Sequence, residues 1–218
     1  MIKAIICDVD GTLLDTERIY MRAWKEAGRK HGYDVTEEVL LATRAINKRE
    51  AVRIFKDALG ESFDYENVWQ ERFLISEEIL EKGGSVLMPG VKEMIELAKK
   101  KGILLAVASS TAVKVTEQHL KSNGILDAFS AVIGGDMVSH GKPAPDIFLK
   151  AAEELHVAPE DCVVLEDSVA GIKSAKAAGM YPILIPDVVP ANNETRTLSF
   201  AVLDSLLEIE PVIDSLMH

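Results

Sequence analysis

The sequence is poor in the features that mark secreted and membrane-bound proteins. Its two cysteines, Cys7 and Cys162, lack C-x-x-C spacing and lie in apolar runs, so we expect buried free thiols. No apolar run approaches the ~20 residues of a membrane span. Asp8 and Asp10 interrupt the apolar start, which is unlike a signal peptide. These absences predict a cytoplasmic protein with no membrane partner.

Positive charge is also scarce. The chain has 24 Lys and Arg against 35 Asp and Glu, a formal net charge of −11. Such a chain repels polyanions, so we expect no nucleic acid as a partner. We also expect the protein to be a monomer. A phosphorylated substrate would need local cations. Zinc-ligand spacing is absent from the five histidines, which are His31, His119, His140, His156 and His218.

Apolar residues are plentiful, and their pattern indicates the fold. Hydrophobic residues make up 48% of the 218, enough for one large domain or a domain with an insertion. Near-continuous apolar runs are typical of strands buried on both faces of a parallel sheet. They lie at residues 2–7, 103–109, 131–135, 162–166, 182–186 and 199–203. Amphipathic helical stretches separate several of them, so we predict a doubly wound α/β parallel sheet, a Rossmann-like core.

One connection in this pattern is far too long for a simple crossover. About 95 residues separate the first two strand-like runs, where a βαβ unit needs one helix and short turns. Most of this segment has helical patterning. We therefore predict a helical cap subdomain over 16–84, inserted into a core formed by 1–15 and 85–218. Its hinges are expected near 14–16 and 85–91.

Polar residues follow the apolar runs where the strands should end. In an open parallel sheet, ligands bind beyond the carboxyl ends of the strands. The candidates there are Asp8, Asp10, Ser109, Ser110, Lys142, Glu166 and Asp167. Taken singly, Ser109 or Asp167 would serve as a helix cap, and Lys142 as a solvated loop lysine. Their joint placement at one edge is what predicts a site.

Several carboxylates at one edge repel each other, and a hard divalent cation relieves that repulsion. Oxygen ligands without histidine or thiolate favour Mg²⁺. The candidate metal residues are Asp8, Asp10, Glu166 and Asp167. A carboxylate can attack phosphorus, a second acid can move the proton, and a lysine and a hydroxyl can stabilise the phosphoryl charge. A calcium loop is disfavoured, because the glycine is fourth and not sixth.

Four ordered motifs match a known family. They read "DVDGT" (8–12), "ASST" (108–111), "GKPAPDIF" (141–148) and "LEDSVAGIKSAKAAG" (165–179). Over nearly its full length, the chain resembles the haloacid dehalogenase-like hydrolases, within them the phosphatases and phosphomutases similar to β-phosphoglucomutase. The resemblance implies Asp8 as nucleophile, Asp10 as acid and base, and Ser109 and Lys142 as phosphate-binding groups. Asp10 argues against dehalogenation, because the dehalogenase members lack this second acid.

The resemblance also gives the inserted segment a role. It corresponds to the family's cap, which closes over the site and selects the substrate. Trp24, Lys48 and Arg72 are expected on the cap side of the pocket, with core packing as an open alternative for Trp24. Two features depart from β-phosphoglucomutase. Tyr20 stands where that mutase has a histidine, and "RAINKRE" (44–50) has no glycine in the loop that grips a distal phosphate.

These observations favour a Mg²⁺-dependent phosphatase acting on a small phosphorylated metabolite, of the sugar or sugar-alcohol phosphate class. The alternative is an isomerase, a phosphomutase of β-phosphoglucomutase type, whose product retains the phosphate. A non-catalytic binding module is a third hypothesis. The intact set of acids, hydroxyl and lysine disfavours it.

Overall fold

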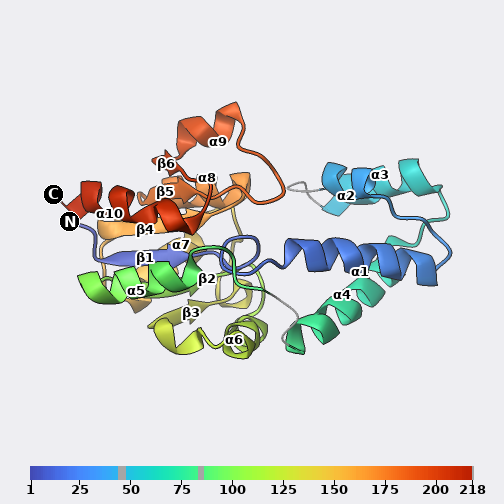
Figure 1. Ribbon diagram of the computed structural model, residues 1–218. Coiled ribbons are helices and arrows are strands. Elements are labelled where there is room, and N and C mark those ends of the chain that lie inside the picture. The colour runs from blue at the N-terminus through green and yellow to red at the C-terminus, as the bar shows by residue number, and fades with distance from the viewer. Residues whose placement is uncertain (44–47, 83–85, 218) are drawn as a thin grey trace. The chain divides into compact units, whose positions relative to one another are not determined.

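The computed structural model describes residues 1–43, 48–82 and 86–217 (Figure 1). The chain forms two compact units. One combines Met1–Asp15 with Val86–His218, and the other is Thr16–Ser85. Their assignment as a catalytic core and a cap stays a prediction, to which the proposals below return.

The first unit contains a six-stranded parallel sheet of order β3-β2-β1-β4-β5-β6. The strands are β1 (Ala4–Cys7), β2 (Leu104–Ala108), β3 (Ala131–Ile133), β4 (Cys162–Glu166), β5 (Tyr181–Leu184) and β6 (Ala201–Val202). Each overlaps one of the apolar runs: β4 has the same bounds as its run, β5 begins one residue before its run, and the other four strands are shorter than theirs. The predicted doubly wound α/β fold is confirmed.

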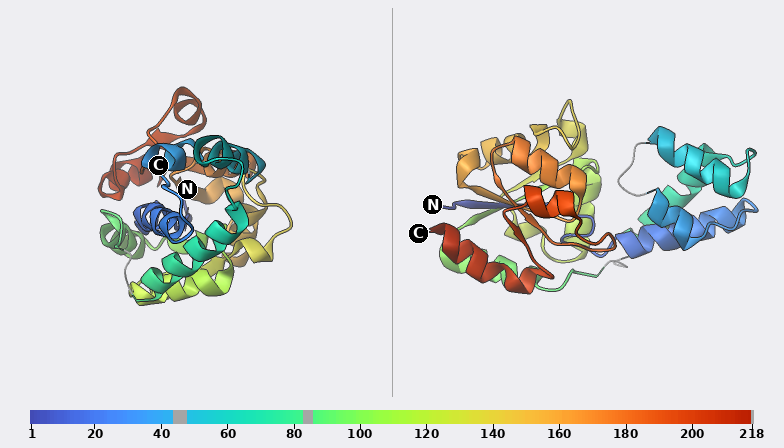
Figure 2. Two further views of the ribbon diagram at one scale, coloured as in Figure 1. Left: turned by 90° about the vertical axis from the view of Figure 1, so that its right-hand side faces the viewer. Right: turned by 90° about the horizontal axis from the view of Figure 1, so that it is seen from above.

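Helices cover both faces of this sheet, as the right-hand view of Figure 2 shows. Odd-numbered residues of the central strands, such as Ile5 and Val163, pack with α5 (Val91–Lys101), α6 (Val113–Ser122) and α10 (Ile209–Met217). Even-numbered residues, such as Ile6 and Val164, pack against α7 (Asp146–Glu154) and α8 (Val169–Ala177). Burial on both faces explains why the strands read as continuous apolar runs. The remaining elements of this unit are α9 (Asn193–Leu198), η1 (Leu126–Ala128), η2 (Gly135–Met137), η3 (Pro159–Asp161) and η4 (Leu206–Glu208).

The strand order places a topological switch point beside β1. After β1 the chain builds β2 and β3 on one side, and then β4, β5 and β6 on the other. Crossovers on opposite sides leave a crevice at the carboxyl ends of β1 and β4, where such sheets bind ligands.

The connections that leave and re-enter the first unit run side by side. Leu14 and Leu87 form an antiparallel bridge. The amide of Asp15 donates to the carbonyl of Val86 at 2.9 Å, and the amide of Met88 donates to that of Leu13 at 2.9 Å. The predicted hinges fall here, and part of the second lies outside the described residues. Hinge motion stays a prediction.

The second unit is helical where it is described. It contains α1 (Glu17–Lys30), α2 (Glu37–Ala42), α3 (Lys48–Leu59) and α4 (Tyr65–Glu81). Its small core is rich in aromatic rings: Trp24 stacks on Phe55 with centroids 4.7 Å apart, and Phe55 stacks on Phe63 at 5.1 Å. Across both units, none of the helices in the described ranges has the length and hydropathy to cross a membrane.

Candidate active site

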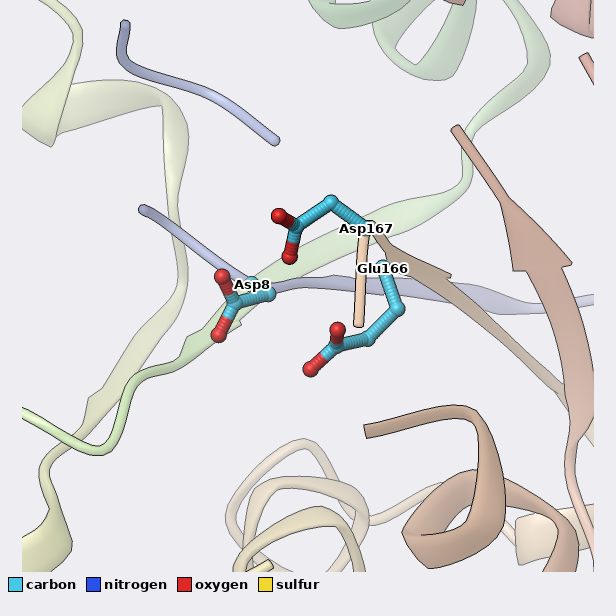
Figure 3. Close-up of side chains that lie close together, drawn as sticks. All are labelled: Asp8, Glu166 and Asp167. Atoms are coloured by element: carbon cyan, nitrogen blue, oxygen red, sulfur yellow. The ribbon is translucent and has the colours of Figure 1, made fainter. Parts of the chain in front are cut away.

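Three acids meet at the switch point (Figure 3). Asp8 directly follows β1, Glu166 ends β4, and Asp167 comes next. Register brings them together, because Cys7 pairs with Leu165 across the two parallel strands. Carboxylate oxygens of Asp8, Glu166 and Asp167 all lie within 4.8 Å of one another, with Asp8 and Glu166 buried. The sequence had placed these acids at one edge, and the structure brings them together.

Lys142 reaches into this cluster from the loop before α7. Its ammonium donates to Asp8 Oδ1 at 2.5 Å, to Glu166 Oε1 at 2.6 Å and to the carbonyl of Ala108 at 3.1 Å. Its side chain is only 6% exposed. The alternative of a solvated loop lysine is therefore excluded. Lys142 therefore forms hydrogen bonds at the carboxyl ends of three strands, β1, β2 and β4.

The cluster has more negative than positive charge. Burial raises the pKa of Asp8 to about 7, although nearby Lys142 opposes the rise, and the charges of Glu166 and Asp10 add to it. Burial alone would lower the pKa of Lys142, but Asp8 and Glu166 hold it well above its ordinary value. Lys142 is thus a fixed cation, and Asp8 is a carboxylate whose charge is only partly compensated.

Glu166 is enclosed by its partners. Its Oε1 accepts from Lys142, and its Oε2 accepts from the amide of Ser168 at 2.9 Å and from the Ser168 hydroxyl at 2.8 Å. A Cβ at Gly171 would lie 1.8 Å from the Glu166 carboxylate, so only glycine fits there. These contacts offset the desolvation of a buried acid. Ser168 also caps α8 through the amide of Gly171, which excludes the reading of Asp167 as that cap.

A tight turn follows β1 beside the cluster. Gly11 has φ +83°, and a Cβ there would lie 2.6 Å from Asp167 Oδ2 and 3.5 Å from Asp187 Oδ2. Half-buried Asp10 lies in this turn, and its charge contributes to the raised pKa of Asp8. Our interpretation of the sequence missed Asp187. The signal was present, because Asp187 follows the apolar run of β5 just as Asp8 follows that of β1.

Ser109 lies at the same sheet edge, at the end of β2 next to β1. It is 1% exposed, its amide donates to the carbonyl of Ile133, and its hydroxyl accepts from the amide of Thr111 at 3.1 Å. It does not cap α6, because the first amide of that helix, at Val113, donates to Asp136 at 2.8 Å. Asp136 is a second residue that we missed. Ser110, the neighbour of Ser109, is exposed.

The predicted cap residues have partners within their own unit. Trp24 is packed against the aromatic core, in agreement with the alternative left open for it. The Arg72 guanidinium lies 4.0 Å from the centroid of the Tyr20 ring. Lys48 pairs with Glu66. Residues 44–47 of the predicted loop lie outside the described residues, and a substrate-binding role for Trp24, Lys48 or Arg72 stays a prediction.

The residues present fit a hard divalent cation. Among the described residues, the candidate metal group consists of Asp8, Glu166 and Asp167, with no histidine or thiolate. All-oxygen ligands suit Mg²⁺, and a cation there would neutralise the negative charge that the clustered carboxylates share. Both oxygens of Glu166 already have partners, so Asp8 and Asp167 are the better direct ligands.

The chain belongs to the haloacid dehalogenase-like hydrolase family, which it matches over residues 2–179. It is 34% identical over 218 residues to a phosphorylated carbohydrates phosphatase of Thermotoga maritima, covering 98% of each chain. It is 29% identical to a β-phosphoglucomutase of Bacillus subtilis, covering 90% of this chain and 92% of that one. The crystal structure of CbbY from Rhodobacter sphaeroides in complex with phosphate superposes with TM-score 0.79 at 31% identity, covering 96% and 97%. Membership of the family and the relatives named phosphatases support a phosphoric monoester hydrolase.

Proposed function

We propose that this protein is a Mg²⁺-dependent phosphatase that hydrolyses a sugar or sugar-alcohol monophosphate through an aspartyl-phosphate on Asp8. The observation that carries the proposal is the contact of Lys142 with Asp8 and Glu166 at the switch point. The named activity of the Thermotoga maritima relative supports the substrate class.

In the first step, a carboxylate oxygen of Asp8 attacks phosphorus. A new phosphorus–oxygen bond to Asp8 forms as the ester bond to the sugar oxygen breaks, and the leaving oxygen takes a proton from Asp10. The position of Asp10 two residues after Asp8, in the turn that follows β1, supports this division of roles.

In the second step, Asp10 takes a proton from water, and that water attacks the phosphorus of the aspartyl-phosphate. The bond between Asp8 and phosphorus breaks, which restores the Asp8 carboxylate and releases inorganic phosphate. Atoms and charge balance without a redox partner. Asp8 is buried, which limits the access of bulk water to the phosphoenzyme.

Charge on the phosphoryl oxygens is met by groups at the same sheet edge. Lys142 is the fixed cation, and Ser109 supplies a hydroxyl. A Mg²⁺ ion held by Asp8, Asp167 and Asp10 would neutralise the carboxylates and polarise a phosphoryl oxygen. Glu166 then serves to hold Lys142 in place, because its two oxygens are bound to Lys142 and Ser168.

Phosphate transfer back to the sugar, as in a mutase, is the less favoured outcome. A mutase must keep water from the phosphoenzyme while its intermediate turns round. Tyr20, which stands in place of the mutase's histidine, lies against the guanidinium of Arg72. A phenol with a pKa near ~10 is a poor proton-linked gate at neutral pH. This difference favours hydrolysis, while the similarity to a β-phosphoglucomutase keeps the alternative testable.

The test is a panel of sugar and sugar-alcohol monophosphates, assayed for released phosphate with Mg²⁺ and with a chelator. We expect release that requires Mg²⁺ and is absent in Asp8→Asn. Full turnover in chelator would remove the metal from the proposal. A parallel coupled assay follows conversion of β-glucose 1-phosphate to glucose 6-phosphate, primed with the bisphosphate. Conversion faster than phosphate release would favour the mutase.

A further inference from the structure

Two loops at the carboxyl edge of the sheet are joined more closely than their sequence separation suggests. The serine loop, Ser109–Ala112, connects β2 to α6. The glycine turn, Gly134–Asp136, follows β3. The serine loop carries the hydroxyl that the proposed function places on phosphate, so whatever fixes this loop bears on the reaction.

Hydrogen bonds join the two segments along their length. The amide of Gly135 donates to the carbonyl of Thr111 at 2.9 Å. Oδ1 of Asp136 then accepts from the amide of Val113, the first residue of α6, at 2.8 Å. One bond therefore holds the middle of the serine loop, and the other holds its exit into the helix.

The glycines bring the two backbones into contact. A Cβ at Gly134 would lie 2.1 Å from the amide nitrogen of Val113, and one at Gly135 would lie 2.3 Å from the carbonyl oxygen of Ser110. Real Cβ atoms do not approach backbone this closely, so the dipeptide is needed for the turn to reach the loop.

Asp136 is needed because the helix cannot cap itself. The residue at the N-cap of α6 is Ala112, which has no side-chain acceptor. The first amides of a helix otherwise lack protein partners, and their dipole favours a negative group. Asp136, far away in sequence, supplies that acceptor and fixes where α6 begins.

The geometry points to Asp136 as a positioning residue for the phosphate-binding step. It acts through the amide of Val113 to hold the serine loop, and hence Ser109, in register with Asp8. Asp136 is not among the acids of the candidate metal group, which are Asp8, Glu166 and Asp167. This inference rests on the proposed function for its kinetic consequence, while the positioning of the loop can be tested without turnover.

The experiment compares Asp136→Ala with Asp136→Asn in the full chain. Alanine removes the acceptor, and asparagine keeps an oxygen in its place while it removes the charge. We expect Asp136→Ala to weaken binding of inorganic phosphate and to lower kcat/KM by roughly tenfold to a hundredfold, because small misplacements of binding groups have effects of that size. Asp136→Asn should restore most of both. Hydrogen exchange at the Val113 amide should accelerate in the alanine variant alone.

Asp161→Ala is the matched control. Asp161 belongs to the same unit but precedes β4, at the opposite end of the strand from Glu166, and it pairs with Lys3 at 2.5 Å. Its removal should leave phosphate binding unchanged, with little effect on Tm. Equal defects in Asp136→Ala and Asp136→Asn, or unchanged phosphate binding in Asp136→Ala, would overturn the inference. A wild-type protein that binds phosphate but hydrolyses nothing in the panel would instead overturn the proposed function, and the exchange and binding measurements would still decide the role of Asp136.

Discussion

The two units of this chain differ in whether they bury ion pairs, although both have surface pairs, such as Lys3–Asp161 in the α/β unit. In the α/β unit, Lys142, Asp8 and Glu166 form ion pairs with side chains 10% exposed or less. In the helical unit, the described ion pairs lie at the surface, as in Lys30–Glu71, where the lysine side chain is 51% exposed. The cores differ as well, because the first is built largely from aliphatic residues, whereas the second also contains stacked aromatic rings.

This contrast distinguishes charges that indicate a functional site from charges that lie on an ordinary surface. Burying charge costs free energy unless partners offset it, so a protein that buries several charges together has a reason beyond folding. Surface pairs contribute little to stability and carry no such implication. The contrast therefore supports the proposal that the chemistry belongs to the α/β unit.

The largest expected effect comes from the nucleophile. Asp8→Asn keeps the shape of the side chain but removes its nucleophilic charge, so phosphate release should fall by about four orders of magnitude or more. The variant should remain folded, since the amide can still accept from Lys142. Circular dichroism checks folding, and a phosphate assay checks turnover. Substantial residual turnover would place the chemistry elsewhere.

Breaking the buried ion pairs tests the contrast directly. Lys142→Ala leaves two carboxylates without their cation, and we expect a loss of roughly 3–5 kcal/mol in the free energy of unfolding besides a loss of activity. Urea denaturation measures the stability. The matched control is Lys30→Ala, whose pair with Glu71 has the same 2.6 Å length as Lys142–Glu166 but lies at the surface. The control should leave stability unchanged, and equal losses in both variants would contradict the contrast.

The aromatic core of the helical unit supports a different prediction. Phe55 is buried between Trp24 and Phe63, so Phe55→Ala should lower the free energy of unfolding by about 3–5 kcal/mol through lost contacts and a cavity.

The order in which the two units unfold is a separate prediction. The units have separate cores, and the core of the helical unit is the smaller, so the helical unit should unfold first. Denaturation followed by tryptophan fluorescence, which reports on Trp24 and Trp69, should precede the loss of phosphate binding. A single shared transition would show that the units fold as one.

A smaller effect is expected from the glycine that encloses Glu166. Gly171→Ala places a methyl group into the Glu166 carboxylate, so we expect a loss of about 1–3 kcal/mol from overpacking, with lower activity as Lys142 shifts. Gly141→Ala is the control, because a Cβ there meets nothing within 4 Å. Thermal unfolding measures both variants. Similar behaviour of the two would mean that Glu166 is free to move.

Much of the fold and part of the site could be predicted because both follow from one pattern. Strands buried on two faces read as apolar runs, and a polar residue that ends such a run lies at the carboxyl edge of the sheet. Asp8, Glu166 and Asp167 were found in this way, and the same rule applied to β5 would have found Asp187. Asp136 directly follows the apolar run at 131–135, so the rule places it at this edge as well, but its contact with Val113 was not predictable, because that contact depends on two glycines that bring separate loops together.

The most direct test of the central claim is chemical trapping of the phosphoenzyme. Asp10→Asn should slow the second step, so a sugar monophosphate substrate should leave phosphate on the protein for long enough to be reduced with borohydride. Reduction converts an aspartyl-phosphate to homoserine, which peptide mass spectrometry can locate. The account predicts homoserine at position 8 and nowhere else. Modification at another residue, or phosphate release with no trapped residue under any quench, would contradict it.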